Sequence, residues 1–211
     1  MSRQDFPELR EGVRQVVSAF DSRYWQEIDE ARAFPEKFVN ALTDAGWLSA
    51  LIPEEYGGSN LSLTEASVIM EEINRAGGNS GACHGQMYVM GCVVRHGSKA
   101  QKEALLPKIA SGELRMQSMA VTEPTTGSDT TQLKTVAVRQ GDHYVVNGQK
   151  VWTSRLQHSD FMLLLARTTP LADVKKKSEG LSVFLVDLRE EVGKTITVSY
   201  THLRAHETLM N

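Results

Sequence analysis

The sequence predicts an α+β fold in which an all-α N-terminal domain is followed by an incomplete antiparallel β-barrel-like domain. Hydrophobic residues recur with helical spacing up to about residue 116 and with the spacing of short strands after it. Turn dipeptides that join antiparallel strands occur in the second part, at Gly141-Asp142 and Asn147-Gly148. We therefore predict a helical domain over residues 1–116, a β domain over residues 117–198 and a separate tail over residues 199–211.

The first two predicted helices each carry one apolar stripe. Pro7 stands in the first turn of the first helix, and Asp5 and Glu8 have the spacing of a capping box. The loop IPEEYGGSN ends the second helix. The stripes consist of Leu9, Val13, Val16, Val17 and Phe20 in the first helix, and of Phe38, Leu42 and Ala45 in the second.

Three more helices are predicted before the β domain. Ser62 with Glu65, and Ser98 with Gln101, have the spacing of capping boxes and mark two of the helix starts. Glycines mark the ends, at positions 77–78, 97 and 112. The apolar residues are Ala66, Ile69, Met70 and Ile73, then Met87, Met90 and Val94, and finally Leu105, Leu106 and Ile109.

Short strands are predicted after Met116. The stretch TVAVRQGDHYVVNGQKVW is interpreted as two or three strands, because two turn dipeptides interrupt it. FMLLLART and LSVFLVDL form two more, joined by the charged loop PLADVKKKSEG, and KTITV begins another. The lysine run at 175–177 is typical of a solvated loop tip, with a phosphate-binding role as the alternative.

Composition narrows the class of protein. A net charge of −3 argues against nucleic acid as a partner, which favours a basic surface. No apolar run approaches the roughly 20 residues of a membrane-spanning helix, and the N-terminus MSRQDFPELREGV lacks the apolar stretch of a signal peptide. Cys83 and Cys92 are interpreted as buried thiols in a reducing compartment rather than a disulfide. We therefore expect a cytoplasmic protein without an integral membrane segment.

The stretch MAVTEPTTGSDTT lies at the predicted boundary between the two domains. Clefts between domains are favoured ligand sites. Pro124 restricts the backbone, Gly127 permits close approach of another group, and several threonines offer hydroxyls. Main-chain N–H groups in such a turn can converge on an acceptor. Composition alone leaves open whether this loop is only a connector.

The complete string resembles a known pattern. VTEPTTGSD, followed about two dozen residues later by VNGQKVWTS, resembles the two flavin-binding signatures of the acyl-CoA dehydrogenase family. RHGSKAQKEALLPKIASGEL, HSDFMLLLART and GLSVFLVDL resemble the stretches around them, so the resemblance covers nearly the whole chain. It implies a helical N-terminal domain, a middle β domain and a C-terminal helical bundle, of which the first two correspond to the predicted domains.

The resemblance implies FAD as the cofactor and a role for particular residues. The main chain of residues 119–122 and the Thr122 hydroxyl face the N1/O2 edge of the flavin, where donors stabilise the reduced ring. Trp152 packs on the isoalloxazine, and Ser154 donates near N5. Ser128 faces the cofactor phosphates and the substrate thioester. The implied cofactor-binding residues are Met119, Val121, Thr122, Gly127, Ser128, Trp152, Thr153 and Ser154, and Ser128 is also the implied substrate-binding residue.

Each of these residues also has a structural interpretation. Trp152 fits the core of a β domain, Ser154 a turn, and Thr122 the end of a strand. The sequence departs from the family pattern at two places. Thr126 stands where the family often has alanine, which affects the shape of the turn, and Ser154 stands where it often has threonine, which keeps the hydroxyl.

The implied reaction is oxidation of an acyl-CoA thioester to a 2,3-enoyl-CoA, as in fatty acid metabolism. A carboxylate removes the α proton while a hydride passes to flavin N5. The implied partners are the acyl-CoA substrate, an electron-transfer flavoprotein and, in the full-length protein, further copies of the chain. The family's catalytic glutamate lies in the C-terminal domain, which the sequence lacks, so no catalytic residue is assigned and this chain is expected to be inactive. Glu123 is expected to be structural.

Two alternatives remain at this point. One is a flavin monooxygenase or nitroalkane-oxidase-like relative with the same architecture, and the other is a non-enzymatic remnant that binds no flavin. The tail SYTHLRAHETLMN resembles a translated adapter peptide, so we expect a non-native segment that begins after Val198. His202 and His206 are four residues apart but lack the H-E-x-x-H pattern, and no metal site is predicted.

Overall fold

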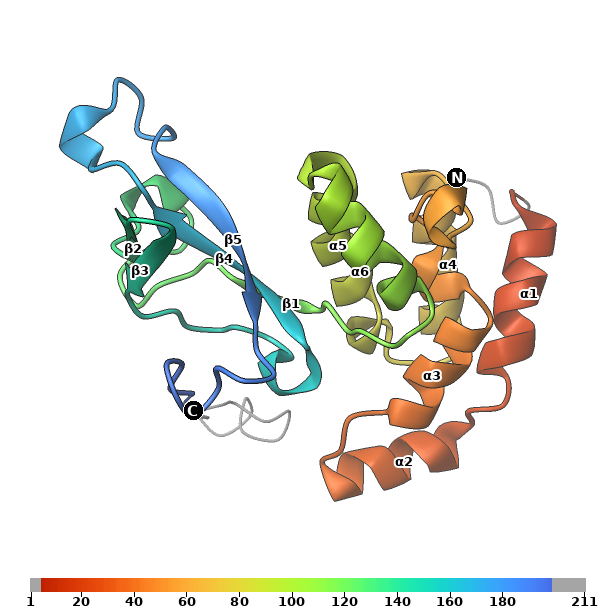
Figure 1. The fold of residues 1–211 in the computed structure, drawn as a ribbon. Coiled ribbons are helices and arrows are strands. Elements are labelled where there is room, and N and C mark those ends of the chain that lie inside the picture. The colour runs from red at the N-terminus through yellow and green to blue at the C-terminus, as the bar shows by residue number, and fades with distance from the viewer. Residues whose placement is uncertain (1–4, 199–211) are drawn as a thin grey trace.

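The computed structural model describes residues 5–198 and consists of a helical lobe (α1–α6) and a sheet lobe (β1–β5), joined through β1 (Figure 1). The chain changes from helix to strand between Ala110 and Ser118, which confirms the predicted fold class. The domain limits at 116/117 and 198/199 stay predictions, and the proposed tail lies outside the described residues. The helices are α1 Pro7–Val17, α2 Ser22–Ala31, α3 Glu36–Asp44, α4 Leu63–Arg75, α5 His84–His96 and α6 Lys99–Ala110.

The helix starts test the predicted caps. The hydroxyl of Ser62 accepts from the N–H of Glu65, and the hydroxyl of Ser98 accepts from the N–H of Gln101, so both capping boxes are confirmed. The predicted box at the start of α1 is wrong. Helix α1 begins after Phe6, whose φ is 60°, and no side chain caps it. The carbonyl of Asp5 instead accepts from the guanidinium Nε of Arg10, at 2.8 Å.

Helix α2 was not predicted, because its apolar stripe is short, with only Tyr24, Trp25 and Ile28, all of which are half-buried. A side chain nevertheless caps the start of α2, since the carboxylate of Asp21 accepts from the N–H of Tyr24 at 3.0 Å. The ring of Tyr24 contacts Phe20 and the ring of Trp25 contacts Phe38, both edge to face, with centroids 4.9 and 4.8 Å apart. Aromatic contacts therefore hold α2 where a buried stripe would hold other helices.

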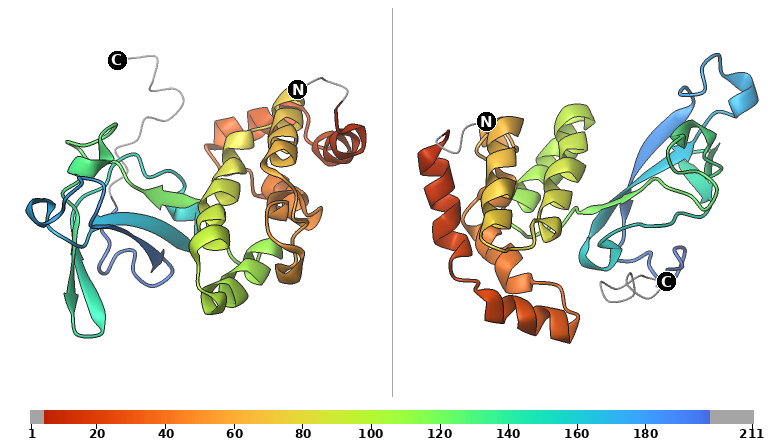
Figure 2. Two further views of the ribbon diagram at one scale, coloured as in Figure 1. Left: turned by 90° about the horizontal axis from the view of Figure 1, so that it is seen from above. Right: turned by 180° about the vertical axis from the view of Figure 1, so that it is seen from behind.

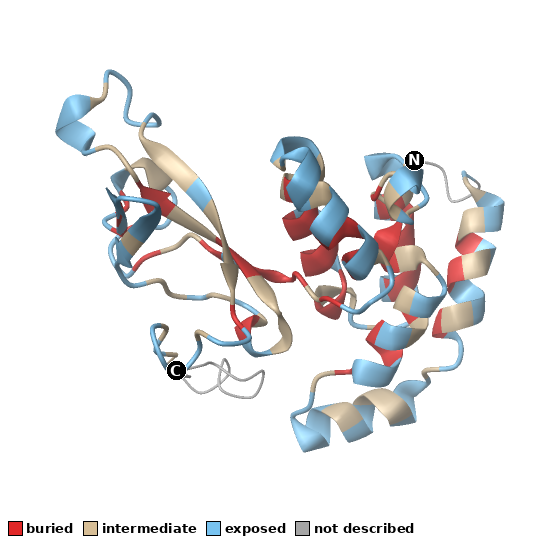
Figure 3. Cartoon of the chain, viewed as in Figure 1, coloured by how far each residue is buried: buried red, intermediate tan, exposed pale blue. Residues whose placement is uncertain are grey.

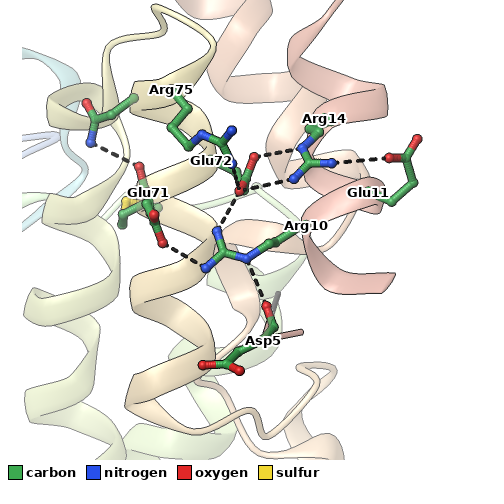
Figure 4. A network of polar contacts seen from close by, with 9 residues as sticks. Asp5, Arg10, Glu11, Arg14, Glu71, Glu72 and Arg75 are labelled. Carbon is green, nitrogen blue, oxygen red and sulfur yellow. Dashed lines mark hydrogen bonds and ion pairs between the residues drawn. The ribbon is translucent and has the colours of Figure 1, made fainter. Parts of the chain in front are cut away.

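A second connection in the helical lobe is a buried ion-pair network between α1 and α4 (Figure 4). The carboxylate of Glu72 is 1% exposed and accepts from Arg10 at 2.5 Å, Arg14 at 2.8 Å and Arg75 at 2.9 Å. Arg10 also pairs with Glu71, at 2.9 Å. Burial raises the pKa of Glu72, but the hydrogen bonds from the arginines outweigh it and lower the pKa to about 2. The carboxylate therefore stays ionised between the helices.

The buried apolar residues form a core in each lobe and a third cluster between them. The helical core lies among α1, α3 and α4. The cluster between the lobes joins α5 and α6 to strand β4 through Leu163, with Phe161 and Leu185 packed against it. Figure 3 shows buried residues on the inner sides of the helices and along β1, whereas the β2–β3 hairpin is mostly exposed. The sheet is therefore anchored on the helices by β1 and β4.

The sheet is mixed rather than antiparallel throughout. Strand β4 pairs with β5 antiparallel along one edge, while β1 pairs with β4 parallel, from Ser118 opposite Met162 to Ala120 opposite Leu164. Strand β2 also contacts β4 in parallel, at Arg167, and forms an antiparallel hairpin with β3. Figure 2 shows this open sheet beside the helical lobe from two further directions. The strands are β1 Ser118–Ala120, β2 Val136–Gln140, β3 His143–Asn147, β4 Phe161–Arg167 and β5 Leu181–Asp187.

The predicted turns and strands are confirmed in part. Gly141-Asp142 joins β2 and β3 as expected. Asn147-Gly148 does not form a hairpin, and QKVW is not a strand. Glycine is needed at 148 for another reason: a Cβ there would lie 2.2 Å from the Thr135 hydroxyl. KTITV is not a strand either, because the N–H groups of residues 194–196 all donate to the carbonyl of Glu191.

Candidate functional site

The site begins with a tight turn directly after β1. The N–H of Glu123 donates to the carbonyl of Thr126 at 2.9 Å, and the N–H of Thr126 donates back to Glu123 at 3.1 Å. Pro124 occupies the second position of this turn, which its fixed φ favours. Thr126 is buried and fits the turn, although the family often has alanine there. The loop is therefore ordered by its own backbone.

Glu123 connects this turn to the start of β2. Its side chain is 3% exposed and accepts from the N–H of Lys134 at 2.6 Å, the N–H of Thr135 at 2.8 Å and the ammonium of Lys150 at 3.0 Å. Burial raises the pKa of Glu123, but the hydrogen bonds from Thr135, Lys134 and Lys150 outweigh it and lower the pKa to about 2. An ionised carboxylate with three donors is a poor proton acceptor, which agrees with the expected structural role of Glu123.

Lys150 is the residue that joins the two signatures. Its ammonium donates to the carbonyl of Val121 at 3.0 Å as well as to the carboxylate of Glu123, so it contacts the first signature at two residues. The next residue completes the connection, since the N–H of Val151 donates to the carbonyl of Thr122 at 2.9 Å. Sequence reasoning did not single out Lys150. The one available signal was an acidic residue in the first signature and a basic residue in the second.

The predicted site residues therefore lie in two segments that are in direct contact. Within these segments Val121, Thr122 and Thr153 are half-buried, while Met119, Gly127, Ser128, Trp152 and Ser154 are exposed. None of them belongs to the core. A polar cavity of about 340 Å³ lies elsewhere, lined by Glu36, Arg115, His158 and Asp160 among others, and includes none of the predicted residues. The site is thus an exposed face rather than an enclosed pocket.

Trp152 is the most informative residue of this face. Its side chain is 64% exposed, so the interpretation of Trp152 as part of a β-domain core is wrong. Its φ is 60°, in a region that residues other than glycine rarely adopt. Such backbone strain is concentrated at functional sites, where the surrounding structure holds it in place. An indole held out of the core in a strained conformation favours contact with a ligand.

The face has the features that a flat aromatic cofactor requires. A Cβ at Gly127 would meet nothing within 4 Å, so the backbone there is open to close approach. Within residues 5–198 the N–H groups of Thr122 and Ser154 donate no hydrogen bond, which leaves them available to an acceptor. Together with the exposed indole of Trp152, these are the groups that could contact a flat aromatic ligand with a polar edge.

Other features of the described residues bear on the earlier predictions. Both cysteines are free thiols, as predicted, but only Cys83 is buried as expected, whereas Cys92 is half-buried. Across residues 5–198 no group of three or more His, Cys, Asp or Glu side chains is arranged to hold a metal ion. In the same part of the chain, no helix has the length and apolar character needed to cross a membrane. His202 and His206 lie outside the described residues.

Comparison with known proteins identifies the family. The pattern of the acyl-CoA dehydrogenase N-terminal domain matches residues 4–113, and that of the acyl-CoA dehydrogenase middle domain matches residues 118–208. The mitochondrial isovaleryl-CoA dehydrogenase of Pongo abelii is 37% identical over 183 residues, which cover 83% of this chain and 43% of that protein. The chain spans less than half the length of the curated relatives it matches.

Solved structures agree with the sequence comparison. An acyl-CoA dehydrogenase from Geobacillus kaustophilus superposes with a TM-score of 0.79 at 29% identity, covering 90% of this chain and 50% of that one. A glutaryl-CoA dehydrogenase in complex with glutaryl-CoA superposes with a TM-score of 0.77 at 29% identity, covering 89% and 47%. With both domain patterns matched in order, the chain belongs to the acyl-CoA dehydrogenase family.

Proposed function

We propose that this chain forms the flavin-binding face of a protein that oxidises acyl-CoA thioesters to 2,3-enoyl-CoA with FAD. The observation that carries the proposal is the contact between the two signature segments, through Lys150 and the hydrogen bond from Val151 to Thr122. Two separate stretches with the family's signature residues meet on one exposed face. Membership of the family supports the same reaction class.

Particular residues would hold the cofactor. The N–H and hydroxyl of Thr122 and the backbone of Met119 and Val121 would donate to or line the N1/O2 edge. Trp152, with Thr153 beside it, would pack against the ring, and the hydroxyl of Ser154 would donate near N5. Gly127 would allow the backbone to approach, and Ser128 would face the cofactor phosphates and the thioester. When bound, FAD supplies the hydride acceptor.

The remaining parts of the activity are also proposals. The general base is expected outside these residues, since Glu123 is fully engaged. We therefore expect this chain to show no acyl-CoA-dependent dye reduction, because a general base typically contributes about 10²–10⁴-fold in rate. An electron-transfer flavoprotein and further copies of the chain are the proposed partners. The cytoplasmic location stays a prediction, and the related isovaleryl-CoA dehydrogenase is a mitochondrial protein.

The test is a titration of the whole chain with FAD, followed by flavin absorbance and by quenching of tryptophan fluorescence. We expect saturable binding with quenching that Trp152→Leu largely removes, because Trp25 and Trp47 lie in the helical lobe. Val138→Ala removes a side chain of similar exposure on β2 and should leave binding unchanged. Absence of saturable binding would favour the non-enzymatic remnant. If FAD binds, oxygen consumption by the reduced protein distinguishes the monooxygenase alternative.

A further inference from the structure

Arg155 extends from the sheet lobe to the start of α5 and follows Ser154 directly. Its φ is 57°, so it shares the strained backbone of Trp152. One guanidinium nitrogen lies 3.2 Å from the position that a Cβ on Gly81 would occupy, and the other lies 3.4 Å from the corresponding position on Gly85. Any larger side chain at these two glycines would crowd the guanidinium. The helical lobe therefore leaves room for this cation beside the proposed flavin face.

The guanidinium of Arg155 makes no hydrogen bond and no ion pair within residues 5–198, unlike other shielded arginines of the chain. Arg10 pairs with Glu72, and Arg115 pairs with Glu36. Arg167 lacks a carboxylate but donates to four main-chain carbonyls. A partly buried cation without a partner is unfavourable, and arginine keeps its charge in proteins. Its retention here favours a ligand as the missing partner.

The neighbours of Arg155 do not supply the missing charge. Cys83 and Tyr88 lie close enough to interact with it electrostatically. Burial raises the pKa of the Cys83 thiol to about 12, so the thiol is neutral at physiological pH. Burial also lowers the pKa of His158, which favours its neutral form. The surroundings of the guanidinium thus carry one uncompensated positive charge.

A second polar side chain without a hydrogen-bond partner lies near Gly85. Gln117 is 0% exposed, and neither its side-chain oxygen nor its side-chain nitrogen has a hydrogen-bond partner within the described residues. Its Cβ lies 3.5 Å from the same Cβ position on Gly85 that Arg155 approaches. Buried amides are nearly always paired, so an unpaired one indicates a missing partner. The unpaired Arg155 guanidinium and the buried, unpaired Gln117 therefore both lie next to Gly85, where the two lobes join.

We propose that Arg155 and Gln117 bind a carboxylate on the acyl chain of the substrate, so that the protein prefers acyl-CoA thioesters bearing a second acidic group. The inference rests on the proposed function and names the substrate class for it. A carboxylate carries the single negative charge that balances one guanidinium, and its two oxygens match the planar arginine fork. A phosphate group would bring up to two charges to a site with one cation. Arg155 would thus determine specificity and would take no part in bond breaking.

The test compares two thioesters with five-carbon acyl chains, glutaryl-CoA and valeryl-CoA. Their dissociation constants are measured by calorimetry on the whole chain with saturating FAD. We expect glutaryl-CoA to bind roughly tenfold more tightly or better, which is the size of effect of a charged hydrogen bond. Arg155→Met should abolish the preference, and Arg155→Lys should retain part of it. Gln117→Glu would supply a carboxylate from the protein itself, so it should raise the melting temperature and abolish the preference.

Several outcomes would overturn the inference. These are equal affinities for the two thioesters, failure of both to bind, and a preference that Arg155→Met leaves unchanged while the variant melts as the wild type does. Inorganic phosphate is added as a competitor, and displacement of glutaryl-CoA by phosphate as readily as by free glutarate would make the site a phosphate site. FAD absorbance in the same samples separates this inference from the proposed function. If FAD binds but glutaryl-CoA and valeryl-CoA bind equally, only the inference about the acyl carboxylate is contradicted.

Discussion

Glu72 in the helical lobe and Glu123 in the sheet lobe are both buried carboxylates that join distant segments, but they do so with different partners. Glu72 accepts from three arginine side chains and connects α1 to α4. Glu123 accepts from two main-chain N–H groups and one lysine, and connects a turn, the start of β2 and the second signature. Both carboxylates have a pKa of about 2.

The difference follows from the backbone around each carboxylate. Helices satisfy most main-chain groups internally, so two helices can be joined only by side chains. Loops leave N–H groups without partners, and a buried carboxylate can satisfy them directly. Glu72 therefore contributes to the stability of the fold, whereas Glu123 sets the shape of the face proposed to bind flavin. The predictions below separate these two roles.

Acidification should have the largest effect, because it acts on both carboxylates at once. Each has a folded-state pKa lowered from 4.5 to about 2, so its contribution is complete above the unfolded pKa and is lost as pH falls from about 4.5 to about 2. We expect the free energy of unfolding to be nearly constant from pH 7 to about pH 5 and to fall steeply below it. Urea unfolding at a series of pH values, followed by circular dichroism, measures this. A curve that is flat down to about pH 2 would contradict it.

Glu72→Gln should cause the largest loss of any single substitution in this set. It leaves the guanidinium of Arg10, with a side chain only 2% exposed, without its buried partner. Breaking such a pair from one side costs about 3–5 kcal/mol in unfolding free energy. Glu103→Gln is the control, because its pair with Lys99 is exposed and 3.7 Å long, and it should cost less than about 1 kcal/mol. Equal losses in the two variants would show that burial of Glu72 does not matter.

Lys150→Met should cost less, about 1.5–3 kcal/mol, since Glu123 loses one charged hydrogen bond but keeps two main-chain donors. The carboxylate should also lose part of its stabilisation, which raises its pKa and moves acid unfolding of the sheet lobe to higher pH. Lys134→Met is the control, because the side chain of Lys134 is exposed and only its N–H contacts Glu123. Urea denaturation curves of both variants at pH 7 measure the loss in unfolding free energy. The same curves at about pH 4 show whether acid unfolding has moved to higher pH.

Gly148→Ala should have the smallest effect on stability, about 1–3 kcal/mol, which is the typical cost of overpacking. The added Cβ would lie 2.2 Å from the hydroxyl of Thr135, next to the N–H that Glu123 accepts. Pairing with Thr135→Ser, which removes a methyl group, should recover part of the loss. An unchanged melting temperature for Gly148→Ala would show that the backbone at 148 can move away from Thr135 at no cost.

These residues also show what the sequence could predict. The capping boxes at Ser62 and Ser98 were predictable because they are local, each spanning three residues. Helix α2 was not, because aromatic edges rather than a buried stripe hold it. The pair of Arg10 and Glu72 spans 62 residues, and that of Lys150 and Glu123 spans 27, so no periodicity reveals them. The positions of the predicted site residues came from the family resemblance, whereas the charged contacts that bring them together came from the structure.

The most direct test of the comparison is the FAD affinity of Lys150→Met set against that of Glu72→Gln, both measured by absorbance titration where each variant is folded. We predict that Lys150→Met, the less destabilised variant, binds FAD at least about tenfold more weakly than the wild type, because it removes both Lys150 hydrogen bonds and leaves only that of Val151 to Thr122 between the two signature segments. Glu72→Gln, the more destabilised variant, should bind FAD as the wild type does. Unchanged affinity in Lys150→Met, or equal weakening in both variants, would contradict the claim that the buried pair of Glu123 and Lys150 shapes the flavin face.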